Sequence, residues 1–240
     1  MVNQKEKTFY WENEVCGTRH SQKKKSLDFY DEVKKKRYKY ETYIRRFLGF
    51  EQKSYLNNKL ILEIGVGAGT DFVQFLKTGA ECYGIDATQA SIDETENNIK
   101  YSLSNFDYKL NYLGKHNAEE LPFESNTFDL VYSHGVLHHA ENSMLCISEA
   151  IRVLKPGGNL KLMVYSNFSA SGIMLWFLHG LMKGKPFVSQ EEIIYRYLES
   201  PGTKSYSKKE LKKILHGFGL KDLTIRKFAG CGDKLLTPPS

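Results

Sequence analysis

Residues 60–71 read Leu-Ile-Leu-Glu-Ile-Gly-Val-Gly-Ala-Gly-Thr-Asp, and this stretch decides the fold. An apolar run ends in three glycines at alternate positions, and Phe72 and Phe75 follow at helical spacing. The pattern predicts a buried strand, a tight turn and a helix, the unit that presents backbone N–H groups to a nucleotide-like ligand. Gly65 and Gly67 allow positive φ angles or close backbone approach, which a side chain would not permit.

A second short apolar run stops at Asp86, where a carboxylate suits the two hydroxyls of a ribose. Glycine-rich turns occur in unrelated nucleotide-binding proteins, but the GxGxG spacing differs from the GxGxxG of dinucleotide enzymes. Glu63, two residues before the first glycine, is a poor neighbour for a pyrophosphate. It fits a ligand that carries a cationic amino group.

Three further segments carry recognisable motifs. They are His-Asn-Ala-Glu-Glu-Leu-Pro-Phe over 116–123, Phe-Asp-Leu-Val-Tyr-Ser-His-Gly-Val-Leu-His-His over 128–139, and Arg-Val-Leu-Lys-Pro-Gly-Gly over 152–158. With the glycine turn and Asp86, five segments in order make residues 60–164 resemble the class I S-adenosylmethionine-dependent methyltransferases. The chain is most similar to the group whose motif pattern also appears in quinone C-methyltransferases and natural-product methyltransferases.

The apolar patterns predict strands near 59–64, 80–85, 110–116, 128–133 and 158–164, alternating with helices near 70–78, 89–103 and 142–154. A capping box at Ser207 and Glu210 begins a further helix, and residues 220–228 alternate as a strand. The resemblance implies an α/β, doubly wound, mostly parallel, seven-stranded Rossmann-like sheet. Only residues 231–236 remain for the last strand, which we expect to be short, irregular or absent.

We divide the chain into four parts: an N-terminal helical cap (1–58), a Rossmann-like cofactor-binding core (59–164), an inserted substrate lid (165–205), and a C-terminal helix with closing strands (206–240). The resemblance implies S-adenosylmethionine as the cofactor. Its methionine part would lie on the glycine turn, its ribose on the acid after the second strand, and its adenine on the residues before Leu-Pro-Phe. The implied cofactor-binding residues are Glu63, Gly65, Gly67, Gly69, Asp71, Asp86, Ala87, Asn117, Ala118, Glu119, Ser133 and His134. Family members usually have Asp at the position of Asn117, whose amide oxygen can still accept from the adenine amino group.

Methyl transfer depends mainly on orientation and exclusion of water, and a hydroxyl or ammonium acceptor also needs a base. His134, His138 and His139 are the candidates, although the His-His pair recurs in family members with different acceptors, which favours a role in holding the loop or in cofactor contact. Bulky apolar side chains in 165–205 favour an aromatic or apolar small-molecule acceptor. Candidate substrate or lid residues are Tyr30, Arg37, Tyr38, Tyr165, Trp176 and Phe177.

The net charge is +6, and residues 21–46 hold ten Lys and Arg against four acids, so the remainder is neutral overall. This excess favours a solvated helix face or a nucleic-acid surface. An RNA methyltransferase that uses this basic helix is therefore an alternative, but the side chains that serve amino-group or cytosine C5 methylation are absent after the fourth strand. A non-catalytic subunit would not need Glu63, Gly65, Gly67 and Asp86, and the glycine spacing disfavours a nicotinamide-dependent dehydrogenase.

The sequence favours a cytoplasmic protein. The first twenty residues are polar, and the longest apolar stretch, 172–182, is too short to cross a bilayer. Four cysteines (Cys16, Cys82, Cys146 and Cys231) show neither metal-ligand nor redox spacing, so we expect reduced thiols and no metal. The acceptor atom and the oligomeric state are not encoded in any recognisable motif.

Overall fold

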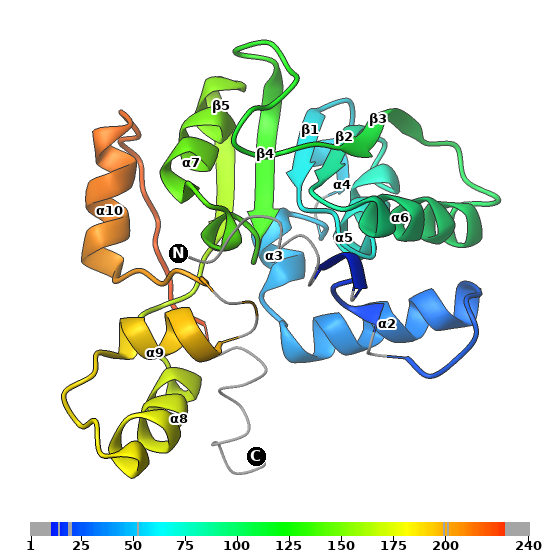
Figure 1. The fold of residues 1–240 in the computed structure, drawn as a ribbon. Coiled ribbons are helices and arrows are strands. Elements are labelled where there is room, and N and C mark those ends of the chain that lie inside the picture. The colour runs from blue at the N-terminus through cyan, green and yellow to red at the C-terminus, as the bar shows by residue number, and fades with distance from the viewer. Residues whose placement is uncertain are drawn as a thin grey trace.

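The computed structural model describes residues 11–13, 15–18, 21–51, 53–198, 200 and 202–228. A parallel sheet in the order β3-β2-β1-β4-β5 forms its centre (Figure 1). The order reverses between β1 and β4, and ligands of open α/β sheets bind outside the carboxyl ends of the strands at such a point. The strands are β1 (Leu60–Ile64), β2 (Glu81–Asp86), β3 (Lys109–Lys115), β4 (Phe128–His134) and β5 (Leu154–Met163).

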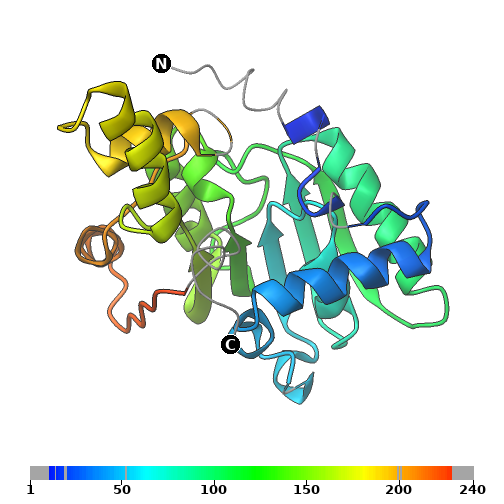
Figure 2. The same ribbon diagram turned by 90° about the horizontal axis from the view of Figure 1, so that it is seen from below.

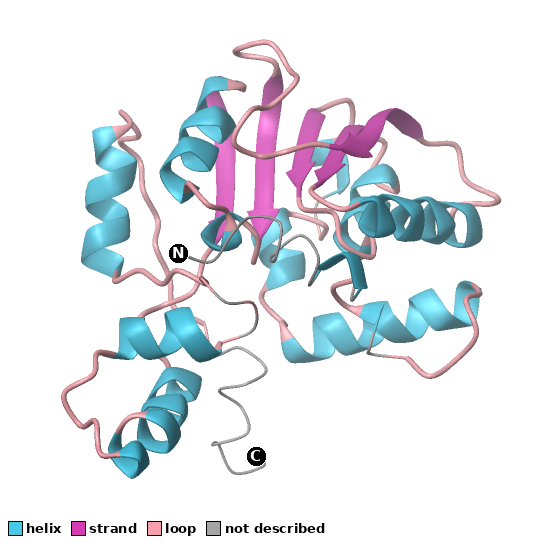
Figure 3. Cartoon of the chain, viewed as in Figure 1, coloured by secondary structure: helices cyan, strands magenta, loops and turns pink. Residues whose placement is uncertain are grey.

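Helices cover both faces of this sheet, as the view along the strands shows (Figure 2). Figure 3 shows the alternation of helix and strand that the sequence patterns predict. The helices are α2 (Leu27–Tyr40), α3 (Ile44–Leu48), α4 (Lys53–Leu56), α5 (Thr70–Leu76), α6 (Gln89–Ser102), η2 (Leu137–His139), α7 (Ser143–Arg152), α8 (Ala170–His179), η3 (Leu181–Lys183), α9 (Gln190–Tyr197) and α10 (Lys208–Gly217).

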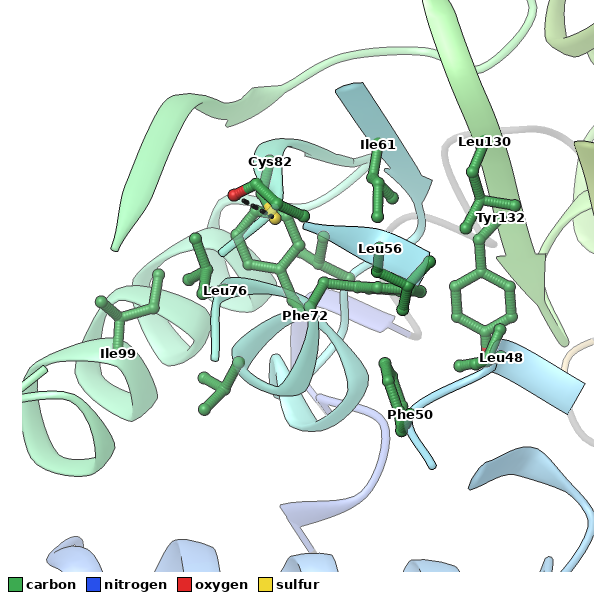
Figure 4. Packing of buried hydrophobic residues seen from close by; sticks show 14 of the residues in the cluster. Leu48, Phe50, Leu56, Ile61, Phe72, Leu76, Cys82, Ile99, Leu130 and Tyr132 are labelled. Carbon is green, nitrogen blue, oxygen red and sulfur yellow. Dashed lines mark hydrogen bonds between the residues drawn. The ribbon is translucent and has the colours of Figure 1, made fainter. Parts of the chain in front are cut away.

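Successive side chains of a strand point to opposite faces of the sheet, and each face has its own hydrophobic core. Ile61 of β1 and Leu130 of β4 pack with α3, α4, α5 and α6, in the cluster drawn in Figure 4. Leu62 of β1 and Val131 of β4 face the opposite side, where they pack with α7 and α10. Strands β1 and β4 are therefore apolar on both faces, which explains the continuous apolar runs that the sequence shows there.

The prediction of seven strands is wrong for the described residues, which form five. Residues 220–228 alternate as a strand does, yet they run beside α10 without strand structure (Figure 1). No backbone hydrogen bond joins 221–228 to β5 within the described chain. Alternation alone does not make a strand when no neighbouring strand accepts the ladder bonds. The predicted last strand, 231–236, lies outside the described residues.

Helices α2, α8 and α9 lie beyond the carboxyl ends of the strands (Figure 1). Two of them, α8 and α9, come from 165–205, the segment that follows β5. A bridge between Ser166 and Tyr206 joins the two ends of this segment. The third, α2, begins at an N-cap in which Ser26 accepts from the Phe29 amide. Residues of α2 and α8, together with the strand ends, line the candidate site.

Candidate active site

A cavity of about 890 Å³ lies at the carboxyl ends of β1, β2, β4 and β5. Its walls include residues 63–68 at the end of β1, 85–88 at the end of β2, 134–137 at the end of β4 and 163–166 at the end of β5. A cavity of this size is typical of a small-molecule or cofactor site. The sheet thus gathers several of the sequence-predicted side chains around one space.

The glycine turn forms one wall of the cavity. Gly65 and Gly67 have φ angles of 83° and 54°, and both line it. A Cβ on Gly65 would collide with the side chain of Val136. Gly69 does not line the cavity: it precedes α5 at φ 68°, and a Cβ there would meet Thr95 at 2.8 Å. The third glycine therefore serves helix packing rather than ligand contact.

Asp86 ends β2 and is fixed by the loops beside it. Its Oδ2 accepts from the Gly67 amide at 3.1 Å, and its Oδ1 accepts from the Thr88 amide and hydroxyl at 3.0 and 2.9 Å. Burial raises the pKa of this carboxyl, and these hydrogen bonds oppose the rise. A carboxylate can accept about four hydrogen bonds, and three are accepted here, so capacity remains for about one more donor such as a ligand hydroxyl.

Glu63 is a buried carboxyl in the same wall, 4% exposed. Its Oε2 has no hydrogen-bond partner among the described residues. Burial, together with the negative charge of Asp71, raises the pKa of Glu63 well above its ordinary value. A buried oxygen without a partner costs free energy unless a ligand supplies a donor. An ammonium group supplies both the donor and the compensating charge.

Asp71 anchors the N-terminal helix α2 to the core. Arg37 of α2 places its Nε 3.2 Å from both carboxylate oxygens of Asp71 and donates to Oδ2 through Nη2. The hydroxyls of Tyr38 and Tyr132 donate to the same carboxylate at 2.9 and 2.8 Å. Burial opposes ionisation, but Arg37 holds the pKa of Asp71 below its usual range. Asp71 and Arg37 both line the cavity, and the carboxylate is already engaged by protein donors.

His134 and Tyr43 meet at the end of β4. The Tyr43 hydroxyl lies 2.9 Å from Nε2 of His134, and Glu41 lies 3.7 Å from the same nitrogen. Burial and the nearby charge of Arg37 lower the pKa of His134 to about 3, so its imidazole is neutral at physiological pH. Phe228 stacks on the Tyr43 ring at 4.1 Å between centroids. This group offers a neutral hydrogen-bonding imidazole beside an aromatic wall.

The other two candidate histidines differ from each other. His139 lines the cavity, and its Nδ1 lies 3.0 Å from the Ser200 hydroxyl and 3.1 Å from that of Thr203. His138 is fully buried, does not line the cavity, and packs its ring 4.2 Å from that of Tyr165. Burial lowers the pKa of His138 well below its ordinary value. The structure therefore places His134 and His139 at the cavity and His138 behind it.

The remaining wall at the predicted adenine position comes from His116, Asn117, Ala118 and Ala87. Asn117 Oδ1 accepts from the Glu119 amide at 3.0 Å, which shapes the turn and leaves its NH₂ free to donate. Glu119 itself faces away from the cavity and accepts from the Asn142 amide.

Five further predicted residues are not in the cavity wall: Ser133, Tyr30, Tyr38, Trp176 and Phe177. Ser133 donates to the Ile64 carbonyl, and Tyr30 donates to Glu94. Trp176 donates through its indole N–H to the Val188 carbonyl, and Phe177 is half exposed. Tyr165 does line the cavity.

Several cavity residues are not among those that the sequence patterns predict. Thr88 fixes Asp86 and caps α6, and an Asp-x-Thr pattern at a strand end was an available signal. Tyr43, Met163 and Phe228 carry no such signal, because they reach the cavity from chain segments far apart in the sequence.

Comparison with known proteins decides the family of this domain. Residues 62–162 match the model of a methyltransferase domain. An uncharacterized methyltransferase of Schizosaccharomyces pombe is 35% identical over 107 residues, which cover 41% of this chain but only 37% of that protein. A demethylmenaquinone methyltransferase of Tropheryma whipplei is 26% identical over 172 residues, covering 70% of this chain and 69% of that protein. Residues 62–162 belong to the class I S-adenosylmethionine-dependent methyltransferases.

The methyltransferase fold extends beyond these residues. Magnesium protoporphyrin IX methyltransferase from Synechocystis, solved with bound SAH, aligns with a TM-score of 0.64 at 16% identity, covering 90% of this chain and 89% of that one. The cofactor of a methyltransferase domain of this class is S-adenosylmethionine. The residues present fit it: an unpartnered buried carboxylate oxygen on Glu63, a turn at Gly65 with no room for a Cβ, and a fixed acid at Asp86.

Proposed function

We propose that the protein transfers a methyl group from S-adenosylmethionine to an O, N or C atom of a small, aromatic or otherwise apolar acceptor. The observation that carries this proposal is the composition of the cavity. Polar groups suited to the cofactor line one part, and Met163, Tyr165, Phe168 and Phe228 line another. An apolar pocket with a few polar groups is typical of a site for a small molecule.

In this proposal the cofactor, when bound, supplies an electrophilic methyl group on a sulfonium. Glu63 would hold its ammonium, Asp86 its ribose hydroxyls, and Asn117 with Ala118 its adenine. The Arg37–Asp71 pair would keep α2 over the cavity and so exclude water from it.

His134 would position the acceptor by a hydrogen bond. Because its pKa is about 3, His134 is a poor general base at neutral pH. This argues for an acceptor that needs little help in losing a proton, or for one that transfers it to water. His139, held by Ser200 and Thr203, would shape the same wall.

We further propose that residues 1–58 act as a cap and 165–205 as a lid, in a protein that works in the cytoplasm. The residues that lead into α8 support the lid, because Phe168, Ser169 and Ala170 line the cavity directly. The quinone chemistry named for the Tropheryma whipplei relative agrees with an apolar acceptor.

Ion pairs made by the basic segment 21–46 argue against the RNA alternative. Lys25 pairs with Glu94, Lys36 with Glu32, and Arg37 with Asp71. Cations already neutralised by protein carboxylates contribute less to phosphate binding.

The test is transfer of tritiated methyl groups from S-adenosylmethionine into a solvent extract of apolar small molecules. The proposal predicts label in the extract with the natural protein and much less with Asp86→Ala. Absence of label, or equal labelling by Asp86→Ala, would contradict it.

A further inference from the structure

The helix α8 presents an apolar stripe outward instead of inward. Ile173, Met174, Phe177 and Leu178 are exposed, and they recur at the i, i+1, i+4, i+5 spacing of one helix face. Of all residues in α8, only Gly172 is buried. A helix on a protein surface normally shows the reverse, with its apolar stripe against the core.

The stripe continues past the end of α8. Leu181 and Met182 of η3 are exposed, Met182 at 66%, and Phe187 in the following loop is 99% exposed. Phe168 at the start of the segment is also 66% exposed. We call this the α8 surface, and its residues are Phe168, Ile173, Met174, Phe177, Leu178, Leu181, Met182, Lys183, Lys185 and Phe187.

The opposite side of α8 packs against α9 and the loop before it. Gly172 packs against Ile194 of α9, where an added Cβ would lie 3.2 Å from Ile194 Cδ1. Trp176 turns inward and bonds to the Val188 carbonyl, and the His179 ring stacks on Tyr197 at 4.0 Å. The apolar outer face is thus held rigidly outward by the packing of the inner one, and it needs an occupant of its own.

The charges around the α8 surface select the occupant. Residues 165–189 contain no Asp or Glu, and Lys183 and Lys185 lie between Met182 and Phe187 in the sequence. The nearest acids in the sequence, Glu191 and Glu192, begin α9, and Glu192 pairs with Arg196. Apolar side chains beside lysines, without acids, fit the interface of an anionic lipid surface.

We propose that the α8 surface docks the protein onto an anionic lipid membrane, with Met182 and Phe187 inserted among the acyl chains and Lys183 and Lys185 at the headgroups. The proposed contact is with the membrane surface, and none of the described helices is long and apolar enough to span a bilayer. Phe168 is 66% exposed and also lines the cavity, so a lipid surface that contacts Phe168 also contacts the cavity wall. An acceptor dissolved in the bilayer would then enter without crossing water.

Vesicle flotation tests this docking without any methyl transfer, so its outcome is independent of the proposed function. The probes are vesicles of phosphatidylcholine alone and of phosphatidylcholine mixed equally with phosphatidylglycerol. We expect the natural protein to float with the mixed vesicles only. The double substitution Met182→Asp, Phe187→Asp should reduce binding by at least about tenfold, and each of Lys183→Ala and Lys185→Ala by about fivefold.

Phe106→Asp is the matched control, because Phe106 is 54% exposed and lies in the loop between α6 and β3. It should bind vesicles as the natural protein does, and far-UV circular dichroism should show every variant folded. Failure to float with either vesicle, or equal loss of binding in Phe106→Asp, would overturn the proposal. A dimer in solution that Met182→Asp separates, without vesicle binding, would assign the α8 surface to a second copy of the chain instead.

Discussion

Arg37 of α2 and Asp71 of α5 form an ion pair beside the glycine turn, with the guanidinium donating to both carboxylate oxygens. The carboxylate is 2% exposed, and Tyr38 and Tyr132 complete its hydrogen bonds. The pair joins the N-terminal segment to the methyltransferase domain at the edge of the cavity.

Arg37→Ala should therefore destabilise the protein strongly. Removal of one partner leaves a buried carboxylate uncompensated, at a cost of about 3–5 kcal/mol in the free energy of unfolding. Urea denaturation measures this quantity. Lys39→Ala, an exposed cation of the same helix, is the control and should cost less than about 0.5 kcal/mol. Equal stability of the two variants would show that the ion pair does not anchor α2.

Glu63 should make cofactor affinity depend on pH. Burial raises its pKa in the free protein, whereas a bound ammonium favours the ionised carboxylate, so binding at low pH must release a proton. Affinity should then rise as pH increases from about 5, by up to about tenfold per unit, and level off above the pKa of the free protein. Calorimetric titration with S-adenosylmethionine measures the profile. Glu63→Gln should bind more weakly with a flatter profile, and an unchanged slope in that variant would assign the proton to another group.

Alanine substitutions at Gly65 and Gly184 separate the cost of a steric clash from the cost of an unfavourable backbone conformation. Both have positive φ, at 83° and 70°, but a Cβ at Gly65 collides with Val136 while nothing lies within 4 Å at Gly184. Gly184→Ala should cost only the backbone term, about 1–2 kcal/mol. Gly65→Ala should cost about 1–3 kcal/mol more and should abolish cofactor binding, because the displaced Val136 belongs to the cavity wall. Similar unfolding free energies for the two variants would show that Val136 moves aside freely.

The sequence predicted the central elements well for a physical reason. Buried parallel strands need continuous apolar runs, and glycines with positive φ mark the turn between β1 and α5, so both features are local. The contact between Tyr43 and His134 is different, because it joins residues from the N-terminal segment and β4 that only the assembled sheet brings together.

Two predictions needed information that the sequence lacks. The strand over 220–228 rested on alternation, whereas its existence depends on a neighbour that offers ladder bonds. Trp176 and Phe177 were assigned to the acceptor wall by composition. Only the packing of α8 against α9 determines which side chains face the cavity and which face outward.

RNA binding should distinguish the two acceptor classes. A protein that follows phosphates with six to ten cations loses roughly a thousandfold or more in affinity between 50 and 200 mM salt. We expect weak binding of bulk RNA and no labelling of it by tritiated S-adenosylmethionine at either salt concentration. Lys24→Ala with Lys35→Ala, two exposed cations of the basic segment, should leave methyl transfer to an apolar acceptor unchanged. Labelled RNA that disappears in this variant would establish the RNA alternative.

We propose above all that the cavity at the ends of β1 and β2 holds S-adenosylmethionine through Asp86. Titration calorimetry with the natural protein, Asp86→Ala and the exposed control Asp107→Ala tests it most directly. We predict one S-adenosylmethionine bound per chain, no binding of NAD, an unchanged affinity in Asp107→Ala, and a loss of about 1.5–3 kcal/mol of binding free energy in Asp86→Ala. An Asp86→Ala variant that stays folded and binds as tightly as the natural protein would contradict the assignment.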